Sequence, residues 1–302
     1  MPFHLGRSAA TNPATVGRWV RSRRDVPETT NPAPPSRARW SDSRSAARRR
    51  AATGPLVTVD VGNTDTVVGR FNGPDLDESW RVTSSRTTTD ELRLQLEQML
   101  RTGAAGCPSV LCSVVPHQTR AWAEALHAIT GRDPIEVSAR TSPIKLQVTE
   151  PDSVGPDRIA NALAGKVLHG SPCIVIDLGT ATTFDCVNRT GAFVGGAIAP
   201  GLTTASSELF RRAARLSDIE LRRPERAIGR TTAENLRVGV LWGYAGLVDT
   251  LVRRMRNELG GRPKVIATGG LARMVAAECE TVDLVDEGLT LKGLQLFWEA
   301  VR

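Results

Sequence analysis

Lysine, tyrosine and long hydrophobic runs are scarce in this chain of 302 residues. None of the four lysines lies in a glycine-rich loop suited to phosphate, which excludes a P-loop with its characteristic lysine. No hydrophobic stretch reaches membrane-spanning length, and the N-terminus lacks the apolar centre of a secretory signal. We therefore expect a cytoplasmic protein without a membrane partner. The lysines are Lys145, Lys166, Lys264 and Lys292.

Cysteine and histidine give no pattern that indicates a redox or metal site. The five cysteines are odd in number and form no Cys-x-x-Cys unit, which argues against a complete disulfide framework. Most stand in apolar, strand-like runs, where a free thiol acts as a small core residue. The four histidines lack the spacing of metal ligands. These residues are Cys107, Cys112, Cys173, Cys186 and Cys279, with His4, His117, His127 and His169.

Positive charge is concentrated in the first 52 residues. These hold 11 arginines and no lysine against three acids, a net of +8, so the rest of the chain carries about −1 of the total of +7. The composition, rich in Arg, Ser, Ala and Pro without a hydrophobic period, predicts a disordered Arg-rich extension over residues 1–54. We favour a passive tail or a translation start assigned too far upstream. Organelle targeting and binding of acidic partners are the alternatives.

Two short stretches about 117 residues apart repeat one pattern. Residues 57–66 and 175–183 each contain an apolar β-branched run, then Asp-x-Gly, small hydroxyl residues and a second apolar run. This predicts a strand, a tight polar turn and a returning strand, written twice. In such a turn the glycine lets the backbone approach a ligand closely. The exposed N–H and hydroxyl groups can bind phosphate oxygens, and the aspartate can hold a cation beside them. Two such hairpins across a cleft predict a phosphotransferase that uses a nucleoside triphosphate.

A third segment, residues 265–271, has the pattern of a buried strand that enters a Gly-Gly turn and then a helix. Bare backbone at such a turn accommodates a planar base or a ribose. One hairpin alone is a common feature, but the three segments in this order predict an α/β protein with the duplicated actin-like, ribonuclease H-like ATPase fold. We expect two similar subdomains around a nucleotide cleft, at residues 55–168 and 169–302.

Alternating helices and strands are predicted between the two hairpins. Residues 87–91 open a helix with hydroxyl caps and acidic residues. A strand over 109–115 then ends at Pro116, a helix covers 119–129, and a short strand follows at 135–137. The expected buried face of the first helix consists of Leu92, Leu94, Leu96, Met99 and Leu100.

Residues 151–165 combine a polar turn with a helix of small residues, whose first turn contains Asp157 and Arg158. A carboxylate there can take the proton of an alcohol that attacks the γ-phosphorus of ATP. The arginine can bind an anionic oxygen of the substrate or of the transferring phosphoryl group. A structural role fits the residues equally well, because an acid at a helix start is favourable and the arginine can pair with it.

Together these motifs resemble type III pantothenate kinases. The resemblance covers residues 56–300 and excludes the Arg-rich extension. It implies ATP-dependent phosphorylation of pantothenate to 4′-phosphopantothenate, the first step of coenzyme A biosynthesis. The motifs, in the family's order, are residues 60–66, 112–116, 155–158, 177–183, 195–201 and 229–232, with Gly239 downstream.

The resemblance also implies roles for individual residues. Asp157 would be the general base, Asp177 would ligate a monovalent cation, K⁺ or NH₄⁺, and Thr180 would contact ATP. Mg²⁺ would accompany ATP, as in phosphoryl transfer generally. Because no lysine lies in these loops, bound cations are expected to supply positive charge. The first ATP-binding loop would consist of Asp60, Val61, Gly62, Asn63, Thr64, Asp65, Thr66 and Val67. Pantothenate would contact Gly155, Pro156, Asp157, Arg158 and Thr232.

Two positions depart from the family pattern. Family members often carry a tyrosine seven residues before Gly155, where this chain has Val148, and a small residue where it has Pro156. These changes concern substrate affinity and selectivity, so a kinase for another small alcohol is one alternative function. The other is a non-catalytic transcriptional accessory protein of the same fold. Its nucleic-acid contact would come from the Arg-rich extension, and we expect no other nucleic-acid partner.

The predicted helix over residues 232–255 is apolar on many sides. Such a helix must be buried on many sides, either within its own subunit or against a second one, and the pattern alone does not choose. The resemblance implies a homodimer with pantothenate bound at the subunit interface. We expect this helix to contribute to that interface.

Overall fold

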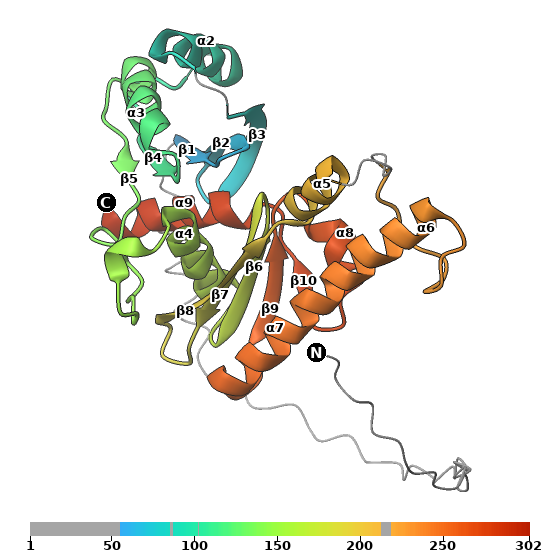
Figure 1. Cartoon of the computed structure of the whole chain (residues 1–302). Helices are drawn as coiled ribbons and strands as arrows, with labels where there is room; N and C mark the ends of the chain where they lie inside the picture. The colour runs from blue at the N-terminus through green and yellow to red at the C-terminus, as the bar shows by residue number, and fades with distance from the viewer. Residues whose placement is uncertain (1–54, 85–86, 102, 213–218) are drawn as a thin grey trace, which may run out of the picture. The chain divides into compact units, whose positions relative to one another are not determined.

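The computed structural model describes residues 55–84, 87–101, 103–212 and 219–302. The predicted Arg-rich extension over residues 1–54 lies outside this part of the chain. Figure 1 shows the described residues as two β-sheets with helices packed on them. Each sheet is built around one of the two predicted hairpins.

The first sheet contains the early strands. They are β1 Pro55–Val61, β2 Asp65–Asn72, β3 Asp75–Thr83, β4 Ser109–Ser113 and β5 Ile135–Glu136. Their order across the sheet is β3-β2-β1-β4-β5. The first three strands are antiparallel neighbours, whereas β4 and β5 run parallel to β1.

The second sheet contains the later strands. They are β6 Cys173–Leu178, β7 Ala181–Val187, β8 Phe193–Pro200, β9 Lys264–Thr268 and β10 Leu284–Val285. Their order is β10-β9-β6-β7-β8, with β6, β7 and β8 antiparallel and β9 and β10 parallel to β6. Strands β6 to β10 therefore correspond one by one to β1 to β5. This repetition confirms the predicted duplicated fold and places the two Asp-x-Gly turns at equivalent points of the two sheets.

Helices connect the strands. The α-helices are α2 Thr89–Leu100, α3 Pro116–Thr130, α4 Pro156–Ala164, α5 Leu202–Arg212, α6 Thr232–Arg237, α7 Gly243–Leu259, α8 Ala272–Ala276 and α9 Leu289–Val301. Shorter segments are the 3-10 helix η1 Pro151–Ser153 and the π-helices η2 Gly165–His169 and η3 Val238–Trp242. Within the described ranges, no helix is both long and apolar enough to cross a membrane.

Helix α2 begins as predicted but buries a narrower face. Thr88 is the N-cap and forms a capping box with Glu91. The expected burial of Leu94 is wrong, since this residue is 59% exposed. Leu94 lies about 200° around the helix from the buried Leu92, while Leu96, one turn further on, shares the buried face.

Pro116 is the first residue of a helix, and the strand before it ends earlier than predicted. The strand predicted over 109–115 ends at Ser113, and α3 begins at Pro116, three residues earlier than expected. Proline has no N–H to donate and its fixed φ suits a first helical turn, so the helix starts there.

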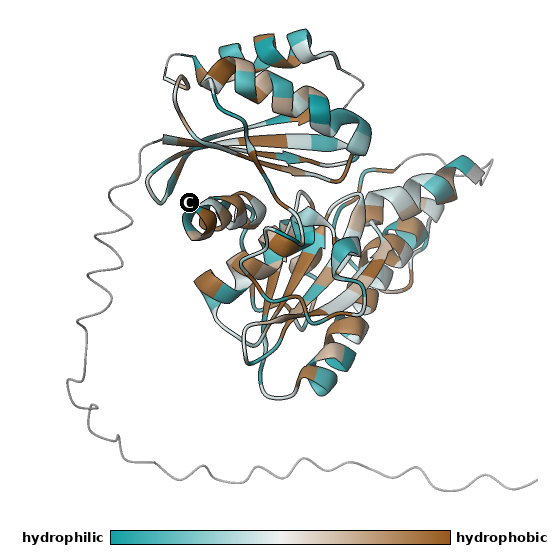
Figure 2. Cartoon of the chain, turned by 90° about the vertical axis from the view of Figure 1, so that its left-hand side faces the viewer, coloured by the Kyte–Doolittle hydropathy of each residue, from teal (hydrophilic) through white to brown (hydrophobic). Residues whose placement is uncertain are grey.

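Alternate residues of β6 face two different cores. Cys173 and Val175 lie in a cluster with residues of α4 and α9, whereas Ile174 and Ile176 pack with residues of α7 and α8. Helices therefore cover both faces of the second sheet. In Figure 2 the brown, hydrophobic stretches fall among the strands and on the helices beside them.

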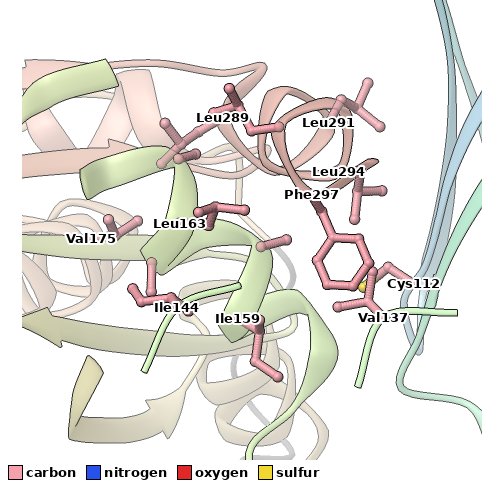
Figure 3. Close-up of a cluster of buried hydrophobic side chains, with 14 of the residues drawn as sticks. Cys112, Val137, Ile144, Ile159, Leu163, Val175, Leu289, Leu291, Leu294 and Phe297 are labelled. Carbon is pink, nitrogen blue, oxygen red and sulfur yellow. The ribbon is translucent and has the colours of Figure 1, made fainter. Parts of the chain in front are cut away.

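Helix α9 completes a core that both sheets share. Phe297 is fully buried in one cluster with Leu56 of β1 and Val175 of β6. Figure 3 shows Phe297 beside Cys112 of the first sheet and Val137. Because α4 and α9 contribute to this common core, they fix the two hairpins relative to each other.

Candidate active site

The two Asp-x-Gly turns meet. The hydroxyl oxygens of Thr64 and Thr180 lie 2.7 Å apart, although 116 positions separate them in the sequence. Each turn is closed through its glycine: the N–H of Gly62 donates to the carbonyl of Asp65 at 3.0 Å, and the N–H of Gly179 donates to the carbonyl of Ala181 at 3.2 Å. The structure thus brings together the two loops predicted to bind phosphate.

Asp60 is partly buried behind the first turn, one residue before the end of β1. Its pKa is raised from 3.8 to about 7, first by burial and then by the negative charges of Asp157 and Asp177. The side chain of Cys112, on the neighbouring strand β4, donates a hydrogen bond that opposes this rise. A carboxylate in these surroundings favours a cation beside it.

Asp177 holds the equivalent position on β6, opposite Thr183 of β7 and Thr268 of β9. Burial raises its pKa from 3.8 to about 6, and the charge of Asp157 adds to the rise. The coupling of both strand-end aspartates to Asp157 shows that three carboxylates lie in one region.

Asp157 stands in the first turn of α4, as predicted. Gly155 is the N-cap and Pro156 occupies the first helical position, for which proline is well suited. The backbone N–H of Arg158 donates to Asp157 Oδ1 at 2.8 Å. Burial raises the pKa of Asp157 above its usual value, against the opposing effect of Arg158. A raised pKa makes this carboxylate a better proton acceptor.

The predicted strand-Gly-Gly-helix element lies against the second turn. Strand β9 ends at Thr268, and Gly269 follows with a φ of +93°, a conformation that favours glycine. A Cβ at Gly269 would lie 2.5 Å from Asp177 Oδ1, so only bare backbone fits there. The N–H of Leu271 donates to the carbonyl of Leu178 at 3.3 Å and fixes the element to β6.

The first loop divides into exposed and buried side chains. Asn63 and Thr64 are exposed at the turn. Thr66 is fully buried, with its hydroxyl oxygen 2.8 Å from that of Ser84, and Val67 packs against the shared core. The side chains of the turn are therefore open to a ligand, whereas those of early β2 stabilise the sheet.

Thr232 lies apart from the other predicted site residues within one chain. It is the exposed first residue of α6, and Thr231 caps the helix. Elements α6, η3 and α7 follow one another without a break, which agrees with the helix predicted over residues 232–255. Figure 1 shows α6 and α4 on opposite sides of the second sheet. The structure therefore does not bring Thr232 to Asp157.

Arg81 supplies a positive charge at the loops that the motifs did not indicate. Strand β3 places it opposite Val67, and its Nη1 lies 3.1 Å from Asp65 Oδ2. It also lowers the pKa of Asp60 against the larger effect of burial. Bound cations are thus not the sole source of positive charge here, because an arginine takes part where lysine is lacking. The signal in the sequence was a charged residue placed between two apolar residues, Trp80 and Val82, in a strand.

Two buried polar residues were also missed. Asn161 of α4 donates from Nδ2 to Asp177 Oδ2 at 3.0 Å and accepts from Thr290 Oγ1 of α9 at 2.8 Å. Asp185 of β7 pairs with Arg158 at 2.6 Å. A polar group inside an apolar helix or strand is costly unless it has a partner. This cost was the signal in the sequence that could have identified both residues.

The arrangement suits phosphoryl transfer. Two hydroxyl-bearing turns meet at matching ends of duplicated sheets, two aspartates lie behind them, and a third with a raised pKa begins α4. Such a site can orient a nucleoside triphosphate, hold cations and take a proton from an alcohol. The fold and the site together define a member of the actin-like ATPase class.

Within that class, the chain belongs to the type III pantothenate kinase family. The sequence profile of this family matches residues 56–254. The type III pantothenate kinase of Roseiflexus castenholzii is 43% identical over 255 residues, which cover 82% of this chain and 99% of that protein. The one of Parafrankia sp. is 44% identical over 248 residues, covering 81% and 97%. These relatives confirm the family that the motifs indicated.

Solved structures support the same fold. A conserved putative Baf family transcriptional activator from Campylobacter jejuni superposes with a TM-score of 0.52 at 19% identity, covering 81% of this chain and 98% of that one. Component A of (R)-2-hydroxyglutaryl-CoA dehydratase from Acidaminococcus fermentans gives a TM-score of 0.50 at 13% identity, covering 83% and 100%. At these identities the likeness concerns the fold alone.

Proposed function

We propose that this chain transfers the γ-phosphoryl group of ATP to the hydroxyl of pantothenate and so makes 4′-phosphopantothenate, the first step of coenzyme A biosynthesis. The observation that carries the proposal is the meeting of Thr64 and Thr180 in front of the aspartate cluster, in a chain of the type III pantothenate kinase family. Fold alone would not assign a substrate, because unrelated activities share it.

ATP is proposed to bind at the two turns. The 2.7 Å approach of Thr64 and Thr180 supports this, since their hydroxyls and the nearby backbone N–H groups can donate to neighbouring phosphate oxygens. Arg81, half-exposed beside Asp65, would add positive charge to the same loop. The proposed ATP-binding set is Asp60, Val61, Gly62, Asn63, Thr64, Asp65, Thr66, Val67 and Thr180.

Asp157 is proposed as the general base. It begins α4 close to Asp60 and Asp177, and burial raises its pKa, which favours proton acceptance from the attacking hydroxyl. The turn before it, Gly155 and Pro156, would contact pantothenate together with Arg158. Arg158 is a cation in an otherwise acidic region and suits an anionic group of the substrate.

Asp177 is proposed to hold a monovalent cation, K⁺ or NH₄⁺, while Mg²⁺ accompanies ATP. Oxygen atoms that can coordinate such an ion lie in this region. Thr268 is paired with Asp177 in the β9–β6 register, and its buried Oγ1 lacks a hydrogen-bond partner in the described structure. No cluster of three or more His, Cys, Asp and Glu side chains among the described residues forms a metal cage, so water and phosphate oxygens would complete the coordination. When bound, the cations supply positive charge beside the phosphates.

A homodimer is proposed to complete the site. Thr232 lies across the second sheet from Asp157, so a second copy of the chain would have to supply it to the pantothenate pocket. The helix that begins at Thr232 supports this, because Gly239, Gly243 and Gly246 form an exposed face on which another helix can approach closely. Sedimentation of an active sample should give a dimer, and a monomer with full activity would contradict it.

The enzyme is proposed to act in the cytoplasm. All five cysteines belong to the described residues and all are free thiols. This agrees with a reducing compartment, where disulfides are rare.

The decisive experiment measures ADP release from ATP and Mg²⁺ with and without pantothenate, in K⁺ and again with Na⁺ in its place. The proposal expects turnover that depends on pantothenate and falls in Na⁺. A panel of other small alcohols at fixed ATP tests the alternative substrate class that Val148 and Pro156 raised. Turnover with one of these alcohols, and none with pantothenate, would replace the proposed substrate.

A further inference from the structure

The guanidinium of Arg158 is held on two sides. Its Nε donates to Asp185 Oδ1 at 2.6 Å, and its Nη2 donates to the carbonyl of Phe184 at 3.5 Å. The ring of Phe193 lies against one face, with 5.4 Å between Arg158 Cζ and the ring centroid. Because these contacts use Nε, one Nη2 hydrogen and one face, the Nη1 edge is left for a ligand.

The surroundings of Asp185 favour its contact with Arg158. It is fully buried in β7, where a lone carboxylate would be costly, and its second oxygen accepts a bond from Thr183 Oγ1 at 3.3 Å. Burial raises its pKa to about 7, against the opposing charge of Arg158. Across the pair of strands stands Gly196, where a Cβ would overlap the backbone carbonyl of Phe184, the same carbonyl that accepts from Arg158, and would come within 3.2 Å of Arg158 Nη2.

The register of the sheet separates this arginine head from the phosphate loops. Thr183 pairs with Asp177, and Asp185 stands two residues further along β7, away from the turn. Two residues of an antiparallel strand span about 7 Å. Because Asp185 holds it, the Arg158 guanidinium therefore lies further from the turn than Asp177 does. Pantothenate carries its reacting hydroxyl and its carboxylate at opposite ends, so an anchor for the carboxylate away from the phosphates suits its shape.

We propose that Asp185 is a positioning residue that holds the Arg158 guanidinium where it binds the carboxylate of the substrate. This rests on the proposed function, because it takes pantothenate as the substrate. Asp185 itself does not touch the substrate. It fixes the side chain that binds the carboxylate, so that the alcohol at the other end reaches Asp157 and the γ-phosphorus.

The test compares two substrates in the Asp185→Ala variant: pantothenate, and its uncharged analogue in which a primary alcohol replaces the carboxylate. The KM for pantothenate should rise about tenfold to a hundredfold, as expected for a displaced anchoring group, with a smaller change in kcat. The KM for the uncharged analogue should change by less than about twofold. Asp185→Asn, which keeps a neutral acceptor, should fall between wild type and Asp185→Ala.

An unchanged or lowered KM for pantothenate in Asp185→Ala would overturn the proposal, because Asp185 would then only compete with the substrate for the arginine. Equal losses with both substrates would also overturn it and assign a purely structural role. Asp249→Ala is the matched control: this buried aspartate of α7 accepts bonds from Glu280 and Thr281, so its loss should lower the melting temperature without changing either KM.

Two further arms keep the outcome clear. If Asp185→Ala does not fold, Thr183→Val removes one bond to the carboxylate and should raise the KM for pantothenate about twofold to fivefold, again without affecting the analogue. Failure of the wild-type protein to use pantothenate at all would instead refute the proposed function. If the wild-type enzyme uses pantothenate but Thr183→Val leaves the KM for pantothenate unchanged, the role of Asp185 would be refuted.

Discussion

At the scale of single residues, the site is a group of carboxylates. Burial raises their pKa values toward neutral pH. Asp60 and Asp185 have pKa values of about 7 and Asp177 of about 6, against an ordinary 3.8. Asp185 has an arginine in direct contact, whereas Asp60 and Asp177 have hydrogen bonds from a thiol and an amide. A bound cation would therefore stabilise the charged forms of Asp60 and Asp177 more than that of Asp185.

Replacing Asp157 tests the general base. Asp157→Asn keeps the shape of the side chain but cannot accept the proton, so kcat should fall about a hundredfold or more while the KM for ATP changes little. Steady-state kinetics at saturating ATP measure this effect. Asp152→Asn, at an exposed position in the turn just before α4, is the control and should retain full activity. Near-normal turnover of Asp157→Asn would place the base elsewhere.

The pKa of Asp60 predicts how stability depends on pH. Between 3.8 and about 7 the folded protein retains a proton that the unfolded chain releases, so the free energy of unfolding should fall as the pH rises through this window. Urea unfolding without ligands at about pH 5 and about pH 8 measures the loss. Asp60→Asn, which does not titrate, should reduce the loss by an amount on the order of 1 kcal/mol or more. A loss of the same size in wild type and Asp60→Asn would contradict the assignment.

At the scale of elements, the sequence predicted those turns and helix starts that depend on interactions between neighbouring residues. The Asp-x-Gly hairpins, the capped start of α2 and the start of α4 all follow from turn and cap chemistry in neighbouring residues. The meeting of Thr64 with Thr180 could be predicted only through the duplicated fold. Partners such as Asp185 for Arg158 could not be predicted, because strand register and helix packing decide which distant polar groups meet.

Helix α9 offers a packing test at the same scale. Gly293 is buried against α4, and an added Cβ would overlap the backbone carbonyl of Ala160. In an ordinary helical position Gly→Ala stabilises by up to about 1 kcal/mol, but here the sign should reverse and Gly293→Ala should destabilise by about 1–3 kcal/mol. Urea unfolding measures the difference. A more stable variant would mean that α4 and α9 pack less tightly than described.

At the scale of the whole molecule, charge and catalysis are separable along the chain. Residues 1–52 carry a net charge of +8, and the rest of the chain, which contains the site, carries about −1. Every proposed site residue lies between Asp60 and Thr232.

Deleting residues 1–52 should therefore leave kcat and the KM for pantothenate unchanged within about twofold, since no proposed contact is lost. The same deletion should abolish any salt-sensitive binding to a polyanion such as duplex DNA, because that binding depends on counterion release by the arginines. Fluorescence anisotropy with labelled DNA at two salt concentrations, beside the ADP assay, measures both effects. A large fall in kcat on deletion would tie the extension to the chemistry.

The shared core has a consequence for how the chain folds. Leu56 of the first described strand and Phe297 of the last helix are buried in one cluster with Val175 of β6. The first sheet buries one of its faces against α9, which follows the last strand of the second sheet and lies far away in the sequence. Although the architecture is a repeat, its halves therefore cannot mature one after the other, and long-range contacts of this kind slow folding. The described residues should unfold in one cooperative transition, in which loss of α9 releases both sheets at once.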